Sequence, residues 1–216
     1  MPRSLDSMLG SSIIAKDGEI GKAYNVFFDD RSWAVRYLVV ETGSWFTRRK
    51  VLLSPAVLGR PDGSKKAIPV QLTEEQVLGS PDVDADRPVA RQQELAMSRR
   101  YGWPDNLGLE LFPSSPWTEV SAPATETASK EGGDPHLRSA KELAGYQVDA
   151  SDGPLGTITD FIIDDEQWEI LDLVVNADDR KAVIPVQWVS AVSWDGRQVQ
   201  LKRPFGKSVT AEFLSA

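Results

Sequence analysis

Short apolar runs alternate with turns rich in glycine and aspartate along most of the chain, and one arrangement of them occurs twice. Residues 17–40 read DGEIGKAYNVFFDDRSWAVRYLVV, and residues 152–175 read DGPLGTITDFIIDDEQWEILDLVV. Both stretches contain a glycine turn, an apolar run, an aspartate pair, a tryptophan and a second apolar run, at an offset of 135 residues. An internal repeat of this kind predicts two copies of one structural unit.

The apolar runs have the length and composition of β-strands, because they are short, rich in β-branched and aromatic side chains, and bounded by turn residues. Asp17-Gly18 is typical of a tight hairpin turn, and Gly21 indicates a bulge or a close backbone approach. The predicted strands are 12–16, 23–28, 33–41, 50–53 and 67–71 in the first copy, and 146–150, 157–163, 168–176, 182–185 and 198–202 in the second. The loop between the third and fourth strands is four residues shorter in the second copy.

Short strands at this spacing predict an all-β protein made of two small antiparallel β-barrels, since closure into a barrel removes unpaired strand edges. The third predicted strand of each copy, at 33–41 and 168–176, is apolar on both of its faces. A strand of this kind is usually covered on both sides. The pattern therefore predicts that the two copies, or two chains, pack against each other outside the barrel interiors.

The middle of the chain has a different character. Residues 82–103 place apolar and basic side chains at helical spacing, which predicts one short amphipathic helix. Residues 113–135 are rich in Pro, Ser, Thr, Ala and Gly, and their few apolar residues do not offset the entropy of ordering. The predicted organisation is a first barrel at 1–81, a helical arm at 82–112, a flexible linker at 113–135 and a second barrel at 136–216.

Charge and composition narrow the classes of function. The 216-residue chain has a formal net charge of −8, with the acidic excess in its second half, which argues against broad binding to nucleic-acid phosphates. No stretch is long and apolar enough to span a bilayer, and the first residues lack the apolar region of a secretory signal. With no cysteine present, these features predict a cytoplasmic protein without a membrane span.

Few residues are suited to catalysis. The only histidine, His136, is either the base of a Ser–His–Asp triad or a surface or capping side chain. The pairs Asp29-Asp30 and Asp164-Asp165 are compatible with acid–base chemistry, but turn formation explains them more simply. We therefore predict that the protein is not an enzyme, with no catalytic residue and no cofactor.

A run of aspartates precedes the predicted helix. Asp82, Asp84 and Asp86 resemble the start of a calcium loop, but Arg87 and Gln93 stand where such a loop requires glycine and glutamate. The alternative is an acidic turn at a helix N-terminus, where the helix dipole favours carboxylates. The prediction is that the protein has no dedicated metal site.

The segment SWFTRRK at 44–50 is the strongest binding candidate, because the second copy lacks most of it and the fold does not require it. A hairpin tip with aromatic and basic side chains suits an acidic protein surface, RNA or lipid headgroups. The alternative is that its aromatic rings pack on their own barrel or at a dimer contact. The candidate binding residues are Trp45, Phe46, Arg48, Arg49 and Lys50.

The repeated string DGEIG…DD…W…YLVV…KVLLSP resembles the PRC-barrel family, which includes the cytoplasmic barrel of the photosynthetic reaction centre H subunit and soluble tandem proteins. The resemblance covers most of 5–80 and 137–204 and implies a barrel used for protein contacts without catalysis. It implies a binding or assembly module whose partner is another protein or a second copy of the chain. The alternative is an RNA- or ribosome-associated factor that uses the loop at 44–50, by analogy with the more distant ribosome maturation factors; the acidic charge makes nucleic acid the weaker choice.

Overall fold

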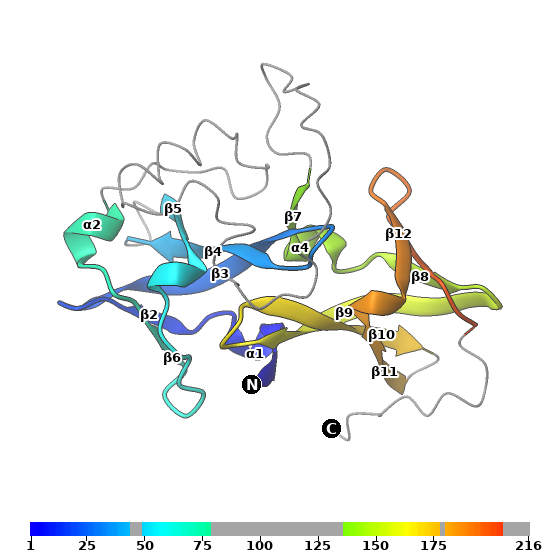
Figure 1. The fold of residues 1–216 in the computed structure, drawn as a ribbon. Coiled ribbons are helices and arrows are strands. Elements are labelled where there is room, and N and C mark those ends of the chain that lie inside the picture. The colour runs from blue at the N-terminus through cyan, green and yellow to red at the C-terminus, as the bar shows by residue number, and fades with distance from the viewer. Residues whose placement is uncertain (44–48, 79–135, 178–179, 205–216) are drawn as a thin grey trace, which may run out of the picture.

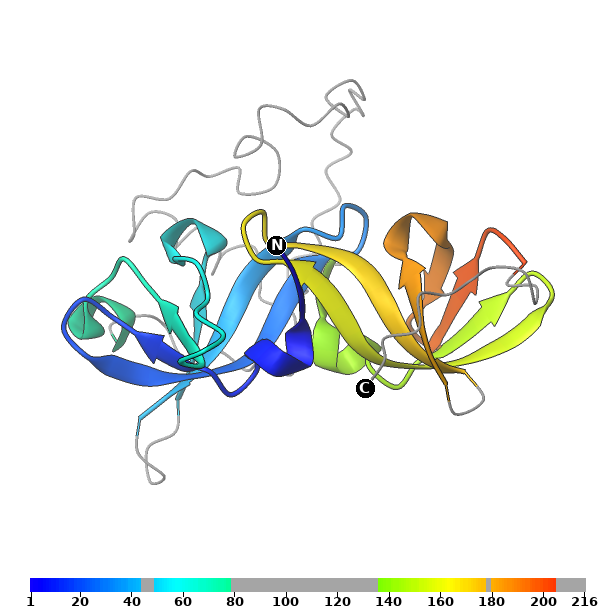
Figure 2. The same ribbon diagram turned by 90° about the horizontal axis from the view of Figure 1, so that it is seen from below.

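The computed structural model describes residues 1–43, 49–78, 136–177 and 180–204 of the chain. In these residues the protein is mostly β-structure, arranged as two mixed sheets that lie side by side (Figures 1 and 2). This confirms the prediction of an all-β fold. The predicted helix at 82–103, the aspartates at its start and the linker at 113–135 lie outside the described residues.

The two repeats begin with the same succession of elements and differ after the 3-10 turn. In the first repeat these are β1 (Pro2–Ser4), α1 (Leu5–Met8), β2 (Ser12–Ile14), β3 (Glu19–Asp29), β4 (Val35–Thr42), β5 (Arg49–Leu53), the 3-10 turn η1 (Pro55–Val57), β6 (Ala67–Pro69) and α2 (Glu74–Leu78). In the second they are β7 (Leu137–Ser139), α4 (Ala140–Leu143), β8 (Gln147–Ala150), β9 (Gly153–Asp164), β10 (Glu169–Ala177), β11 (Arg180–Pro185), η2 (Val186–Trp188), β12 (Val189–Ser193) and β13 (Gln198–Leu201).

The strands β2 to β5, and likewise β8 to β11, follow one another as antiparallel hairpins. Asp17-Gly18 lies between β2 and β3, as predicted. At Gly21, β3 runs so close to β4 that an added Cβ would overlap the carbonyl oxygen of Glu41. Gly156 approaches Asn176 in the same way. Only glycine fits at such a contact, so the predicted close approach at Gly21 is confirmed.

The strand pairing differs from the predicted antiparallel barrels. β6 pairs parallel to β2, and β13 pairs parallel to β8. Among the described residues, the order in the first sheet is β5-β4-β3-β2-β6, and in the second it is β11-β10-β9-β8-β13-β12. The structure therefore corrects the prediction of purely antiparallel pairing, and it describes two open, bent sheets in which barrel closure is not seen.

Each sheet takes one further strand from the other repeat. We call β1 and β7 the lead strands, because each is the first strand of its repeat. β1 pairs antiparallel with β9, and β7 pairs antiparallel with β3. The registers are equivalent, since Pro2 faces Asp164 as Leu137 faces Asp29. The repeats therefore exchange their lead strands reciprocally.

An approximate twofold axis passes between β4 and β10. Ala34 and Glu169, which are equivalent in the two repeats, form an isolated antiparallel bridge with each other. On either side of it, the Val35 N–H donates to the Trp168 carbonyl at 2.7 Å, and the Ile170 N–H donates to the Trp33 carbonyl at 2.9 Å. This bridge and the lead strands join the repeats into one body.

The exchange also shapes the core. α1 packs on β9 and α4 packs on β3, so that both short helices lie at the centre of the molecule (Figure 2). Phe27, Leu143 and Ile163, which come from both repeats, belong to one continuous buried cluster. Each large side chain in it stabilises the fold by roughly 1.5–3 kcal/mol. The predicted packing of the two copies on each other is confirmed, and it occurs within one chain.

Candidate functional site: two equivalent hollows between the repeats

The first aspartate of each Asp pair forms a turn, as the sequence predicts. The Oδ1 atom of Asp29 accepts hydrogen bonds from the backbone N–H groups of Arg31 at 3.0 Å and Ser32 at 2.9 Å. Asp164 caps the equivalent turn of the second repeat in the same way, with distances of 2.8 and 2.9 Å. A side chain that satisfies two adjacent N–H groups holds the turn in one conformation.

The tryptophan after each turn has a left-handed backbone, with φ of 63° at Trp33 and 54° at Trp168. This conformation is uncommon for any residue other than glycine. It folds the side chain back onto the preceding strand, and the Trp33 ring stacks on that of Phe28 with the centroids 5.3 Å apart. Each turn is therefore held in its conformation by contacts within its own repeat, independently of its contacts with the other repeat.

The second aspartate of each pair binds the lead strand of the other repeat. Asp165 is only 1% exposed, and its carboxylate accepts hydrogen bonds from Arg3 and from the Met1 ammonium group. Burial favours the neutral form of Asp165, but these two cationic donors outweigh burial and lower its pKa below the ordinary value. Turn formation, which the sequence predicts for both aspartates, describes only the first of them.

Asp30 has the equivalent role in the other half of the molecule. Its carboxylate lies 3.0 Å from Nδ1 of His136 and 3.4 Å from Nε of Arg138, both at the start of the second repeat. His136 is neither fully exposed nor a helix cap, because it belongs to this contact between the repeats. The second aspartate of each pair thus binds the lead strand of the other repeat, one on each side of the axis.

A second polar contact holds each short helix. Asn25 is buried; its Nδ2 donates to Ser139 Oγ at 2.8 Å, and its Oδ1 accepts from the Lys141 N–H at 3.2 Å. Ser139 is also the N-cap of α4. In the other half, the Asp160 carboxylate accepts hydrogen bonds from the hydroxyl of Ser4, which is the N-cap of α1, and from the backbone N–H of Asp6. These contacts fix where the first residues of each repeat lie.

A hollow of about 290 Å3 opens where the Asp-Asp turn of the first repeat faces β12 of the second. We call it the open hollow. It has one aromatic wall in which Arg138 lies over the Trp194 ring, 4.2 Å from the centroid. Its lining residues are Asp30, Arg31, Trp33, His136, Val189, Ser190, Ala191, Val192 and Trp194.

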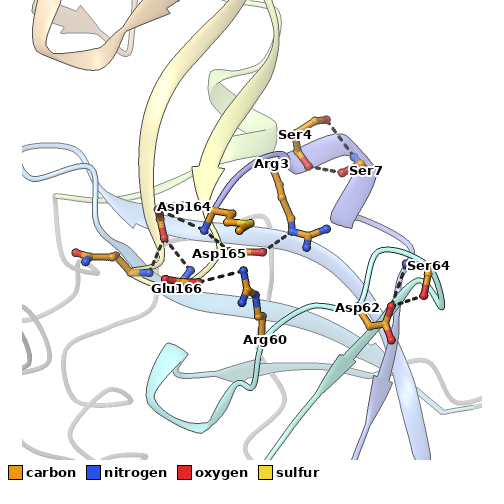
Figure 3. Close-up of polar contacts among 11 residues, drawn as sticks. Arg3, Ser4, Ser7, Arg60, Asp62, Ser64, Asp164, Asp165 and Glu166 are labelled. Atoms are coloured by element: carbon orange, nitrogen blue, oxygen red, sulfur yellow. Dashed lines mark hydrogen bonds and ion pairs between the residues drawn. The ribbon is translucent and has the colours of Figure 1, made fainter.

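The twofold axis places an equivalent position on the other side of the molecule, which we call the closed hollow (Figure 3). There the Arg60 guanidinium reaches across to the Glu166 carboxylate at 3.1 Å. Arg3 occupies the place of an aromatic wall, because a Cβ at Gly63 would lie 2.7 Å from its guanidinium. The closed hollow is thus filled by side chains of the protein itself.

Three substitutions between the repeats account for the difference. Arg31 stands in place of Glu166, Ala191 in place of Arg60, and Trp194 in place of Gly63. The Arg31 side chain is exposed, and its guanidinium forms no ion pair with any described residue. The open hollow therefore lacks the internal ion pair that fills its counterpart.

The open hollow contains the residue types of a hydrolase triad, but they are not connected as one. Asp30 and His136 are in contact, whereas the Ser190 hydroxyl donates to the Gln200 carbonyl at 2.9 Å. Within the described part of the chain, no hydrogen bond joins Ser190 to His136. In a triad the nucleophile is hydrogen-bonded to its base, and the described structure does not show that bond between Ser190 and His136.

The predicted binding segment is only partly described. Trp45, Phe46 and Arg48 lie outside the described residues. Arg49 and Lys50 begin β5, where Arg49 donates to the Leu78 carbonyl at 3.2 Å and the Lys50 ammonium lies 4.3 Å from the Tyr24 ring centroid. These two side chains contact their own repeat, and neither lines the open hollow.

The residues that form the contact between the repeats are not predicted by the sequence pattern. A signal was present, because the 135-residue offset that relates Gly10 to Gly145 also relates Arg3-Ser4 to Arg138-Ser139. Extending the repeat upstream of its glycine would have indicated that this dipeptide has a shared role. That the dipeptide binds the opposite repeat follows only from the fold.

Comparison with known proteins gives no family for the chain, since no protein-family model matches it and no curated protein sequence matches it significantly. The resemblance to the PRC-barrel family stays a prediction. In the described ranges, no helix is long and apolar enough to cross a membrane. No group of three or more His, Asp or Glu side chains is placed to hold a metal ion in those ranges.

Proposed function

We propose that the protein is a non-catalytic binding module of the PRC-barrel type, which acts in the cytoplasm and docks a protein partner in the open hollow. The observation that carries this proposal is the inequivalence of the two hollows. Arg60 and Glu166 fill one of them, whereas the other presents Arg31 beside an aromatic wall. Tryptophan and arginine around a hollow are the residues that most often dominate the energy of protein–protein contacts.

The stability of the fold does not explain why one hollow is filled and the other is not. Both partners of the Arg60–Glu166 pair are more than half exposed, at 52% and 56%. An ion pair of this kind stabilises a protein by about 0–1 kcal/mol. The absence of the pair from the open hollow therefore costs the fold little, and it leaves a surface free for a partner.

The proposal is tested by closing the open hollow. The double variant Arg31→Glu/Ala191→Arg transfers the charge arrangement of the closed hollow to the open one, and we call it the plugged variant. A photo-crosslinking amino acid in place of Val192, introduced into the full chain, reports which protein occupies the hollow in cell lysate. We expect a discrete crosslinked protein that disappears in the plugged variant.

The matched control is Arg60→Glu/Glu166→Arg, which reverses the ion pair of the closed hollow and leaves the open hollow unchanged. This control should retain the crosslinked protein. An unchanged crosslink in the plugged variant, or crosslinks only to other residues of the same chain, would contradict the proposal. A product of twice the chain mass would identify a second copy as the partner.

A further inference from the structure

The closed hollow shows what the open hollow lacks. In the closed hollow, a basic side chain from the segment before β6, Arg60, meets an acidic side chain on the Asp-Asp turn, Glu166. In the open hollow, the turn carries the base Arg31, and the opposite position is the short side chain of Ala191. Compared with the closed hollow, the turn therefore carries a positive charge in place of a negative one, and the opposite position has no charged side chain. The group that completes the pair is a carboxylate.

The charges around the open hollow favour the same group. Asp30, the acid in its lining, is in contact with both His136 and Arg138. Arg31, which lines the same hollow, then remains as a cation without an ion-pair partner among the described residues, and the Arg138 guanidinium lies over the Trp194 ring. A hollow with this charge on a chain of net charge −8 attracts anions selectively.

The neighbouring strand favours an extended occupant. β12 is the last strand of its sheet in the described residues, and Ser190, Ala191 and Ser193 on it are exposed. The equivalent stretch of the first repeat has Pro61 where β12 has Val192, and proline blocks pairing because it has no N–H group. β12 has no such block, and strand addition at an edge is a common mode of peptide recognition.

We propose that the open hollow binds an extended acidic segment of another protein, which lies beside β12 and places a glutamate or aspartate carboxylate on Arg31. This inference rests on the proposed function and adds the chemistry of the partner. Trp33 and Trp194, which both line the open hollow, contact the apolar part of the segment, while Arg31 binds the carboxylate.

The probe is a blocked peptide of sequence Thr-Val-Glu-Val-Thr, titrated into the full chain while the indole N–H signals of Trp33 and Trp194 are followed by NMR. We expect both signals to shift. The Gln version of the peptide should bind roughly two- to fivefold more weakly, as expected for loss of one partly exposed ion pair. Binding of the Glu peptide should also weaken as salt is raised, because salt screens this contact.

Variants at Arg31 supply the matched control. Arg31→Gln should remove the preference for the Glu peptide, and Arg31→Lys should keep most of it, since the charge is retained. Equal binding of the Glu and Gln peptides to the unmodified protein, or an unchanged preference in Arg31→Gln, would overturn the inference. So would the absence of any shift at Trp194.

The two proposals fail in different ways. If the plugged variant loses its crosslinked protein but the unmodified chain does not distinguish Glu from Gln, the binding module stands and the acidic occupant is wrong. If plugging changes neither the crosslink nor the peptide titration, both proposals are wrong.

Discussion

At the scale of single residues, the aspartate pair shows how one short motif serves two purposes. The first aspartate caps the turn of its own repeat, and the second binds an arginine of the other repeat. Adjacent residues can do this because the turn directs their side chains differently. The pair is therefore both a local turn signal and a long-range contact, and only the first role is readable from local sequence.

The buried carboxylate of Asp165 makes a prediction about pH. Its pKa is lowered in the folded protein, so its contribution is present above the unfolded value of 3.8 and is lost as the pH falls through the folded pKa. Asp165→Asn should reduce the free energy of unfolding at pH 7 by about 1–3 kcal/mol, as expected for a buried charge-assisted hydrogen bond. The difference between the two proteins, measured by urea denaturation, should shrink as the pH falls below 3.8.

Comparison with the variant is needed because other acids respond in the opposite direction. Burial raises the pKa of Glu169 and of Asp172, so protonation of these two groups favours the folded state as the pH falls. Glu169 and Asp172 are present in both proteins, so their contribution cancels when the free energy of unfolding of Asp165→Asn is subtracted from that of the unmodified protein. Asp30→Asn is the matched control and should cost less at pH 7, since the Asp30 contacts are longer and its side chain is 14% exposed. A cost of Asp165→Asn that is the same at both ends of the pH range would contradict the assignment.

At the scale of elements, the sequence predicts what is locally encoded. β3, β4, β9 and β10 carry long apolar runs between glycine and aspartate turns, and each was predicted within a few residues. β1 and β7 are only three residues long, and their partner strands belong to the other repeat. No periodicity is detectable in so short a segment, so neither strand was predicted.

The parallel pairs were missed for a related reason. β6 joins β2 only after the chain has passed through β3, β4, β5 and the turn η1. The alternation of polar and apolar residues reports which face of a strand is buried, but it does not report the direction of its neighbour. The antiparallel prediction followed from the hairpins, which are correct, and was wrong where the connection is long.

The polar contact at Asn25 predicts how a lead strand can be released. Asn25→Ala removes the acceptor of the Lys141 N–H and the partner of Ser139, so β7 and α4 should loosen from β3. Hydrogen exchange of residues 137–143 should become faster, while residues 2–8 stay protected.

The matched variant acts on the other half of the molecule. Asp160→Ala should release β1 and α1 from β9 and leave residues 137–143 protected, because Asp160 holds Ser4 and the Asp6 N–H. If either variant accelerates exchange equally in both segments, or in neither, the lead strands are not held as described.

At the scale of the whole molecule, the two repeats form an internal dimer whose halves are not identical. The fold and its axis are shared, but the residues at the two hollows have diverged, with Arg31, Ala191 and Trp194 replacing Glu166, Arg60 and Gly63. Alignment of the repeats lists these differences. The alignment does not reveal that the substituted residues lie at one place. They come from opposite repeats and are brought together only because the repeats exchange their lead strands.

The packing of the two repeats about one twofold axis is the central claim, and a disulfide across the axis tests it most directly. Ala34 and Glu169 bridge without hydrogen-bonding to each other, an arrangement that brings the Cα atoms of antiparallel strands to about 4.5 Å. The chain has no cysteine, so Ala34→Cys/Glu169→Cys introduces the only two thiols. The control is Ala34→Cys/Asp17→Cys, because Asp17 lies at the far end of β3, about 30 Å away by strand length.

Mild oxidation followed by mass spectrometry of the denatured protein gives the answer. The account predicts that Ala34→Cys/Glu169→Cys forms a disulfide within one chain, while the control pair keeps its thiols free. Free thiols in the first variant, or a disulfide that joins two chains, would contradict the arrangement of the repeats about their axis.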